Sequence, residues 1–141
     1  MNTYQPSAAA ASFMLFDVLR AQDTLGQLPA LAESADTDLM RQVLEEAGKF
    51  VGEVVAPLNR DGDEIGARFK DGAVTMPPGF RAAYQAFWQA GWPALSGAPE
   101  DGGQGLPTVL EMVLYEWLSA ANHGWTMAPG LLHGAYECIK H

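Results

Sequence analysis

Residues 98–107, with the sequence APEDGGQGLP, constrain the fold most, because this stretch suits neither a helix nor a strand. Its glycines and polar side chains predict a tight turn. Pro107 then fits the first position of a helix, since its φ is fixed near the helical value and it has no N–H to satisfy. Apolar side chains recur at helical spacing after it, at positions 109, 110, 113, 114, 117, 118 and 121. The pattern predicts a helix over residues 108–122 with a broad apolar stripe that faces a core.

The same turn invites comparison with a phosphate-binding loop, and the sequence argues against that function. The run Gly103-Gln104-Gly105 lacks the third glycine of a dinucleotide fingerprint, and no strand-like segment precedes it. The carboxylates of Glu100 and Asp101 would repel a pyrophosphate. No Lys-Ser or Lys-Thr pair follows, so the loop does not match a P-loop either. A purely structural turn is the better interpretation.

Length, charge and cysteine content exclude several classes of protein. A chain of 141 residues is long enough for one domain with its own core. The formal net charge of −9 argues against nucleic acid and anionic membranes as partners. A single cysteine excludes an internal disulfide and is typical of a reducing compartment. No Lys or Arg precedes Arg20 and no apolar run is long enough to cross a membrane, so we expect a cytoplasmic protein without a signal peptide.

The N-terminal third is predicted to hold one short helix and one long helix. We expect an extended lead over residues 1–11, then a helix from its N-cap Ser12 to about Arg20. A stronger pattern begins at Asp36 or Thr37 and continues with a period of 3.6 residues to about residue 59. Pro57 should kink or end this helix, and residues 60–68 should form a loop. We therefore divide the chain into a lead segment over residues 1–35 and a helical domain over residues 36–141.

The rest of the chain is predicted to add one hairpin and three helices. Asp71-Gly72 supplies the positive φ angles of a type I′ turn, so residues 68–75 are predicted to form a small hairpin. Two short strands alone are marginally stable, so the hairpin must pack against the helices. A helix should run from the Pro77-Pro78-Gly79 segment to about residue 90, with Gly91 after its end. The chain should break at residues 122–124, and Pro129 should begin a last helix. The fold class is mostly all-α, an irregular helical bundle with one small hairpin.

Several motifs in order resemble the N-terminal helical domain of the flavin-dependent acyl-CoA dehydrogenases. The turn and its helix give the pattern Pro-Glu-x-Gly-Gly-x-Gly-Leu followed by an apolar helix that carries Glu116. The remaining matches lie at residues 4–6, 13, 17–19, 44–50, 55–60, 62–63, 71–72, 77–80 and 91–92. The resemblance covers nearly all of the chain, and it points to the subgroup of longer enzymes that resemble methylmercaptopropionyl-CoA dehydrogenase.

The resemblance implies that the complete protein removes two hydrogens from an acyl-CoA thioester with the help of FAD. In the family a carboxylate takes the α proton and the flavin takes a hydride from the β carbon. That base lies in a C-terminal domain, so no catalytic residue is assigned within this chain. The family also implies an electron-transfer flavoprotein as partner and a homo-oligomer. The last predicted helix reaches the end of the sequence, so we expect an inactive fragment, truncated at its C-terminal end.

The helix over residues 108–122 carries the candidate substrate-binding residues. Val113, Trp117 and Ala121 lie four residues apart and therefore share one face. Alignment to the family implies that this face forms part of the acyl-pocket wall, where the bulk of Trp117 would shorten the pocket. The alternative is that all three residues belong to the core. Glu116 matches a family glutamate, and a solvated surface charge is its alternative.

A metal site is not expected. The spacings among His123, His133, His141 and Cys138 match no standard set of zinc ligands. His133 and Glu137 lie one helical turn apart and suit a surface ion pair, and we expect Cys138 to be a buried, inert thiol.

Two other functions stay open from the sequence. The chain could be a stand-alone helical interaction module that kept this domain and lost the enzyme. It could also belong to a related flavoprotein with oxidase chemistry. The stand-alone module predicts a native chain that ends after His141 and has no flavin partner, whereas only the missing domains distinguish the oxidase from a dehydrogenase.

Overall fold

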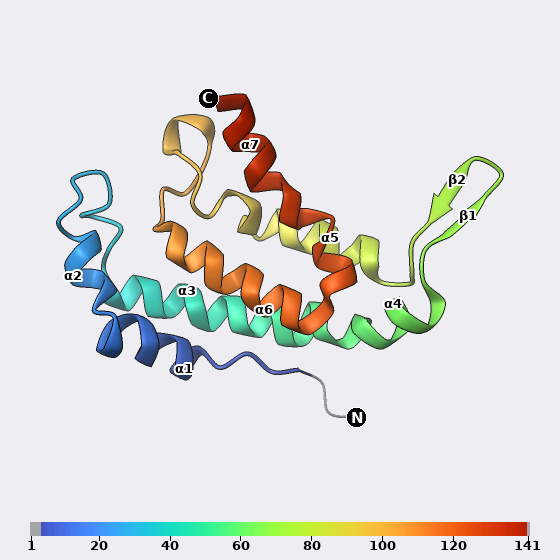
Figure 1. The fold of residues 1–141 in the computed structure, drawn as a ribbon, viewed down its shortest axis with the longest axis horizontal. Coiled ribbons are helices and arrows are strands. Elements are labelled where there is room, and N and C mark those ends of the chain that lie inside the picture. The colour runs from blue at the N-terminus through green and yellow to red at the C-terminus, as the bar shows by residue number, and fades with distance from the viewer. Residues whose placement is uncertain (1–3, 141) are drawn as a thin grey trace.

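The computed structural model describes residues 4–140 and is mostly helical, with one two-stranded antiparallel hairpin. Expectations for residues 1–3 and His141 lie outside the described residues. Two long helices, α3 (Thr37–Phe50) and α6 (Thr108–Thr126), run side by side along the body, and α5 (Phe80–Gln89) crosses the same core (Figure 1). The predicted fold class is confirmed.

The N-terminal helix begins earlier than the sequence suggested. α1 (Ala8–Ser12) starts after Ser7, whose hydroxyl accepts a hydrogen bond from the backbone N–H of Ala10 at 3.2 Å. Ser7 is therefore the N-cap, and Ser12 is buried against the core instead. The extended lead predicted over residues 1–11 is wrong for residues 8–11, because the run of alanines favours a helix. A π-helical turn (Phe13–Val18) continues α1, and α2 (Ala21–Leu25) follows.

The predicted N-cap of the long helix is confirmed, but its C-terminal side is not a loop. The Asp36 carboxylate accepts the N–H of Leu39 at 2.8 Å. A π-helical turn (Val51–Val55), a 3₁₀ turn (Ala56–Leu58) and α4 (Asn59–Ile65) continue the helical path.

The loop predicted over residues 60–68 is therefore wrong. Pro57 lies in the first turn of the 3₁₀ segment, where its missing N–H costs little. In α4 an ion pair joins Arg60 Nε to Glu64 Oε1 at 2.7 Å, and helical pairing at this spacing stabilises the turn. Gly66, with φ at 65°, ends α4.

The hairpin forms at the predicted place but projects into solvent. β1 (Arg68–Lys70) pairs antiparallel with β2 (Ala73–Thr75), and Phe69 lies opposite Val74. Asp71 and Gly72 have φ of 52° and 79°, which suits a type I′ turn. All six strand residues are exposed, and Figure 1 shows the hairpin extending away from the bundle. The expectation that its strands pack against the helices is wrong.

The second long helix is two helical segments joined at Asn122. Pro107 has φ −57° and ψ 130°, so it precedes the helix rather than opening it. Asn122 has φ −160° and ψ 84°, and its side-chain oxygen accepts the N–H of Trp125 at 3.0 Å. It thus acts as the N-cap of a new helical turn, which confirms the predicted break. A 3₁₀ turn (Pro129–Leu131) and α7 (Leu132–Lys140) complete the described chain.

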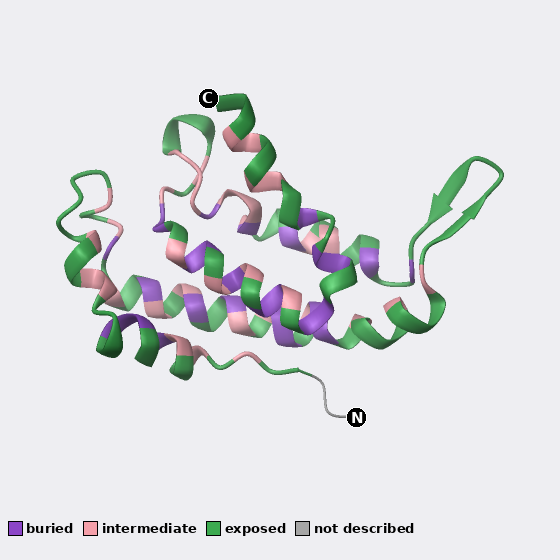
Figure 2. Ribbon diagram, viewed as in Figure 1, coloured by how far each residue is buried: buried purple, intermediate pink, exposed green. Residues whose placement is uncertain are grey.

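The core lies between α3, α5 and α6. Phe87 is fully buried, and its ring lies 5.6 Å from that of Trp125 and 5.9 Å from that of Phe50, measured between centroids. The buried positions of α3 and α6 recur along the faces that meet (Figure 2). Among the aromatic residues of α5, Phe80 and Phe87 are buried, whereas half of Trp88 is exposed. Within residues 4–140 no helix has the length and apolar character needed to cross a membrane.

Candidate functional site

The glycine-rich turn uses its own backbone amides. The N–H groups of Gly103, Gln104 and Gly105 donate to the carbonyls of residues 98, 94 and 97 at 2.8–2.9 Å. Amides that already donate within the loop cannot also hold phosphate oxygens. The turn is therefore structural, as the sequence indicated, and it sets the start of α6.

The structure places the three candidate acyl-pocket residues at different depths. Trp117 and Ala121 are buried in the core, and Val113 is half-buried. A Cβ placed on Gly48 of α3 would lie 3.7 Å from the Trp117 ring, so the two helices approach closely at this glycine. The acyl-wall role and the core role of these residues both remain compatible with this placement.

Two of these candidates line a pocket together with the N-terminal segment. Val113 and Trp117 line a pocket of about 510 Å³ together with Tyr4, Met14 and Glu116. Burial raises the pKa of the Tyr4 hydroxyl, and the negative charge of Glu116 raises it further. Ala121 does not line this pocket. Val113 and Trp117 therefore line the same pocket, whereas Ala121 lies outside its lining.

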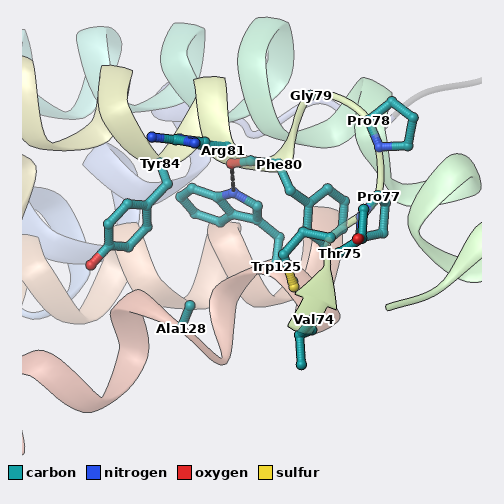
Figure 3. Close-up of a pocket in the computed structure, with 11 residues that line it drawn as sticks. Val74, Thr75, Pro77, Pro78, Gly79, Phe80, Arg81, Tyr84, Trp125 and Ala128 are labelled. Carbon is teal, nitrogen blue, oxygen red and sulfur yellow. Dashed lines mark hydrogen bonds between the residues drawn. The ribbon is translucent and has the colours of Figure 1, made fainter. Parts of the chain in front are cut away.

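A larger pocket, of about 660 Å³, lies at the base of the hairpin (Figure 3). Its wall is mainly apolar and comes from Phe80, Trp125, Ala128 and the segment that leads from β2 into α5, with Arg81 and Tyr84 beside them. The indole N–H of Trp125 donates to the backbone carbonyl of Phe80 at 3.1 Å, which joins the end of α6 to the start of α5. The sequence analysis missed this pocket, because its walls come from segments far apart in the chain.

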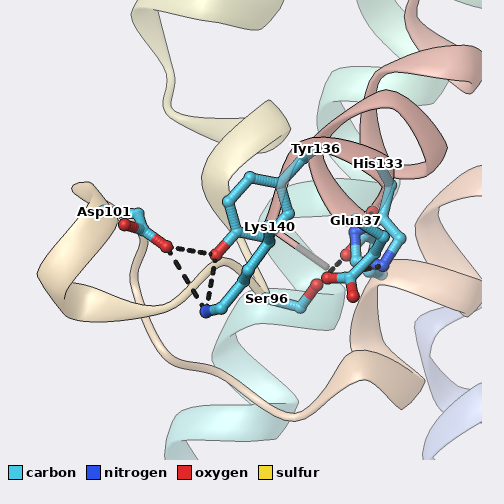
Figure 4. Close-up of polar contacts among 7 residues, drawn as sticks. Ser96, Asp101, His133, Tyr136, Glu137 and Lys140 are labelled. Atoms are coloured by element: carbon cyan, nitrogen blue, oxygen red, sulfur yellow. Dashed lines mark hydrogen bonds and ion pairs between the residues drawn. The ribbon is translucent and has the colours of Figure 1, made fainter.

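A buried carboxylate connects α6 to the loop before it and to α7. Glu111 is 5% exposed, and it accepts a hydrogen bond from the Ser96 hydroxyl (Figure 4). Its other oxygen lies 3.3 Å from Nδ1 of His133, whose Nε2 lies 3.8 Å from Glu137. The expected pair of His133 and Glu137 is confirmed. Ser96 donates to the carboxylate rather than to the imidazole, so the cluster is not arranged as a nucleophile with its base.

A second polar cluster lies further along α7. The Tyr136 hydroxyl donates to Asp101 at 2.6 Å, and Lys140 lies 3.3 Å from the same carboxylate oxygen (Figure 4). The hydrogen bond from Tyr136, followed by that from Lys140, lowers the pKa of Asp101. The hydrogen bond with Tyr136 is also the largest cause that raises the pKa of Lys140 to about 12.

Cys138 is exposed, so its predicted burial is wrong. The reason is that α7 has no buried residue. Apolar side chains of this helix are exposed as well, including Ile139 with 87% of its surface accessible.

Comparison with known proteins finds relatives among longer enzymes. The chain is 38% identical over 129 residues to a 3-methylmercaptopropionyl-CoA dehydrogenase of Ruegeria pomeroyi, an alignment that covers 88% of this chain and 22% of the relative. It is 28% identical over 133 residues to the broad-specificity linear acyl-CoA dehydrogenase FadE5 of Mycobacterium tuberculosis, covering 92% of this chain and 21% of that protein. No family model matches the chain. The chain therefore spans about a fifth of the length of these relatives.

Proposed function

We propose that this chain acts as the N-terminal helical domain of an acyl-CoA dehydrogenase. The reason is its homology to these enzymes over about a fifth of their length. The observation that carries the proposal is the 38% identity to the dehydrogenase of Ruegeria pomeroyi, which extends over 88% of this chain. The mostly helical fold with a single hairpin agrees with it. The proposed division into a lead over residues 1–35 and a helical domain from residue 36 belongs to the same hypothesis.

In this proposal the complete protein carries out FAD-dependent α,β-dehydrogenation of an acyl-CoA thioester. The present chain contributes packing and part of the acyl-pocket wall, and it is inactive alone. The complete protein would work in the cytoplasm, would pass electrons to an electron-transfer flavoprotein and would form a homo-oligomer. The electron acceptor and the homo-oligomer follow from the family, and each of these statements is a proposal for this protein.

The glycine-rich turn does not fit the flavin's pyrophosphate. Its amides donate within the loop, and the carboxylates of Glu100 and Asp101 lie in the same turn. No step through FAD is therefore assigned to residues of this turn. In the proposed enzyme most of the flavin contacts would come from residues outside this chain.

The residue-level proposal concerns Val113, Trp117 and Ala121 as the acyl-pocket wall. The pocket that Val113 and Trp117 line supports the proposal for these two residues, and the proposal for Ala121 rests on its helical spacing from Trp117. Replacing Trp117 by alanine in the complete enzyme should extend the range of accepted acyl-chain lengths, because it removes bulk from the wall. Trp88→Ala is the matched control, since Trp88 is half-exposed on α5. Unchanged chain-length preference in Trp117→Ala would assign the residue to the core alone.

The first test of the proposed function is the intact mass and absorbance of the native gene product. A chain several times heavier than 15.1 kDa with flavin absorbance, and activity on a panel of acyl-CoA thioesters, would support the dehydrogenase. A native mass near 15.1 kDa without flavin would instead support the stand-alone interaction module. Substrate-dependent formation of hydrogen peroxide, without transfer to an electron-transfer flavoprotein, would indicate the related oxidase.

A further inference from the structure

The hairpin of β1 and β2 projects from the bundle without cover from the described residues. All six strand residues are exposed, and Figure 1 shows both strands extending away from the helices. Its central cross-strand pair, Phe69 and Val74, leaves 75% and 63% of the two residues accessible. A hairpin of two strands alone is only marginally stable in water, and further strands stabilise it. The hairpin is therefore the part of this fold that gains most from an added strand.

The two edges of this small sheet differ in charge. β1 carries Arg68 and Lys70 on either side of Phe69. An antiparallel copy of β1 would set Arg68 opposite Lys70, and like charges at opposite positions disfavour pairing. The strand β2 has the sequence Ala73-Val74-Thr75, which carries no charge and includes two β-branched residues that favour strands. The edge that is open to pairing is therefore that of β2.

The register of the hairpin gives the direction of the unpaired backbone groups. Lys70 and Ala73 flank the two-residue turn and form the closing pair, which is hydrogen-bonded between the strands. Hydrogen-bonded and non-hydrogen-bonded pairs alternate along an antiparallel ladder, so the next pair, Phe69 and Val74, exchanges no hydrogen bonds. The N–H and C=O of Val74 therefore point away from β1, toward the open edge of β2.

We propose that the open edge of β2 pairs with β2 of a second copy of this chain. The two strands run antiparallel about a twofold axis at Val74, so the N–H of Val74 in each copy donates to the Val74 carbonyl of the other. Ala73 of one copy then lies opposite Thr75 of the other, and no charged side chains meet. The product is a four-stranded sheet in the order β1-β2-β2-β1, in which both copies contribute the same edge.

The side chains favour a second copy over a strand of unrelated sequence. Phe69 and Val74 share one face of the hairpin, because they lie directly opposite each other. Figure 3 shows the Val74 side chain pointing away from Trp125 and Phe80. In the paired sheet the Val74 side chains of both copies lie between the two Phe69 rings, so exposed apolar groups of each copy form one continuous stripe. A second copy supplies this match automatically.

The pairing should be weak, and it is independent of the proposed enzyme. A strand of three residues buries little surface, so we expect a dissociation constant in the micromolar-to-millimolar range. The pairing uses only residues of the hairpin and does not rest on the proposed dehydrogenase. A failed acyl-CoA assay would therefore leave it standing, and a monomeric protein would leave the dehydrogenase proposal standing.

The first test measures the mass of the 141-residue chain by sedimentation equilibrium, at concentrations up to about 1 mM. The chain should associate toward twice its mass of 15.1 kDa. Val74→Lys should weaken this association by at least about tenfold, because it sets two like charges opposite each other at the twofold axis. Phe69→Lys is the matched control. It places the same charge on the same face, one strand further from the partner, and should weaken association less.

Cysteine cross-linking tests the register without depending on the affinity of a charged variant. The single cysteine, Cys138, is replaced by serine, and either Val74→Cys or Phe69→Cys is added. In the proposed sheet the two Val74 Cα atoms lie about 5.5 Å apart, which a disulfide can span. The two Phe69 positions are separated by three strand spacings, roughly 14 Å. Mild oxidation should therefore link Val74→Cys chains and leave Phe69→Cys chains largely unlinked.

Three outcomes would overturn the proposal. A chain that stays monomeric up to about 1 mM has no such pairing, and the edge of β2 is then left to a strand of another sequence. Equal weakening of the dimer by Val74→Lys and Phe69→Lys would show that the edge of β2 is not the contact. Cross-linking of Phe69→Cys as readily as Val74→Cys would show that another surface holds the copies together.

Discussion

Different forces stabilise two regions of the molecule: the core between α3, α5 and α6, and the C-terminal helix α7. In the interior, side chains such as Phe87, Leu114 and Val51 are completely buried, and aromatic rings pack edge to face. α7 has no buried residue, and polar contacts to Glu111 and Asp101 link it to the rest of the chain. Burial of apolar surface is strong and independent of pH, whereas polar contacts at a surface contribute little each and depend on protonation. We therefore expect α7 to loosen before the core does.

The largest effect should come from the centre of the core. Phe87→Ala removes a ring that contacts Phe50 and Trp125, and it should lower the free energy of unfolding by about 3–5 kcal/mol. Urea unfolding followed by circular dichroism measures this loss. Phe69→Ala is the control, since 75% of Phe69 is exposed on the hairpin and its loss should cost at most about 0.5 kcal/mol. Equal losses in the two variants would contradict the described core.

The next effect should separate α7 from the core. Glu111→Ala leaves the Ser96 hydroxyl and the His133 imidazole without their carboxylate, and should cost about 1–3 kcal/mol because the site is buried. Hydrogen exchange should accelerate more in α7 than in α3, since α7 depends on this contact. Glu116→Ala, on the exposed side of α6, serves as the control. Uniform acceleration across both helices would show that α7 and the core unfold as one unit.

A smaller effect is expected at the start of α3. Asp36→Ala removes the acceptor for the Leu39 N–H and should cost about 1 kcal/mol, which a thermal melt detects. Asp36→Ser should recover most of this loss, because a serine oxygen also caps helices. Failure of serine to recover stability would assign the effect to the charge of Asp36 near the helix N-terminus instead.

The sequence predicted those features that depend on neighbouring residues. The Asp36 cap, the Asp71-Gly72 turn, the Gly91 stop and the break at Asn122 are each encoded within a few residues, and the structure confirms all of them. The family resemblance was confirmed as well, because it rested on several motifs in a fixed order.

Features that depend on distant contacts were not predictable from local pattern. α4 reads as a loop because its glycine and acidic residues disfavour a helix, yet Phe80 packs on Gly62 and stabilises it. The burial of Glu111 depends on partners at positions 96 and 133, and no short pattern connects them. Cys138 was assigned to a core that does not cover α7. The pocket beside Asn122 could not be predicted either, since α4, α5 and α6 each supply part of its wall.

The smallest effect tests the outer contact of α7 through its protonation. The pKa of Asp101 lies below its usual value, mainly because the Tyr136 hydroxyl donates to it. A carboxylate whose pKa is lowered on folding adds stability above its unfolded pKa, and that contribution is lost as pH falls through the folded pKa. α7 should therefore exchange its amides faster in acid than at neutral pH, while α3 changes less.

Tyr136→Phe should raise the pKa of Asp101 toward that of an ordinary aspartate, which an NMR titration of its side-chain carboxyl carbon measures. Tyr4→Phe is the control, because the pKa of Asp101 should not respond to a tyrosine at the N-terminal segment. An unchanged Asp101 pKa in Tyr136→Phe would mean that Lys140 alone holds the carboxylate. The attachment of α7 would then depend on the ion pair of Lys140 with Asp101, which is lost in acid when Asp101 is protonated and in strong base when Lys140 loses its proton.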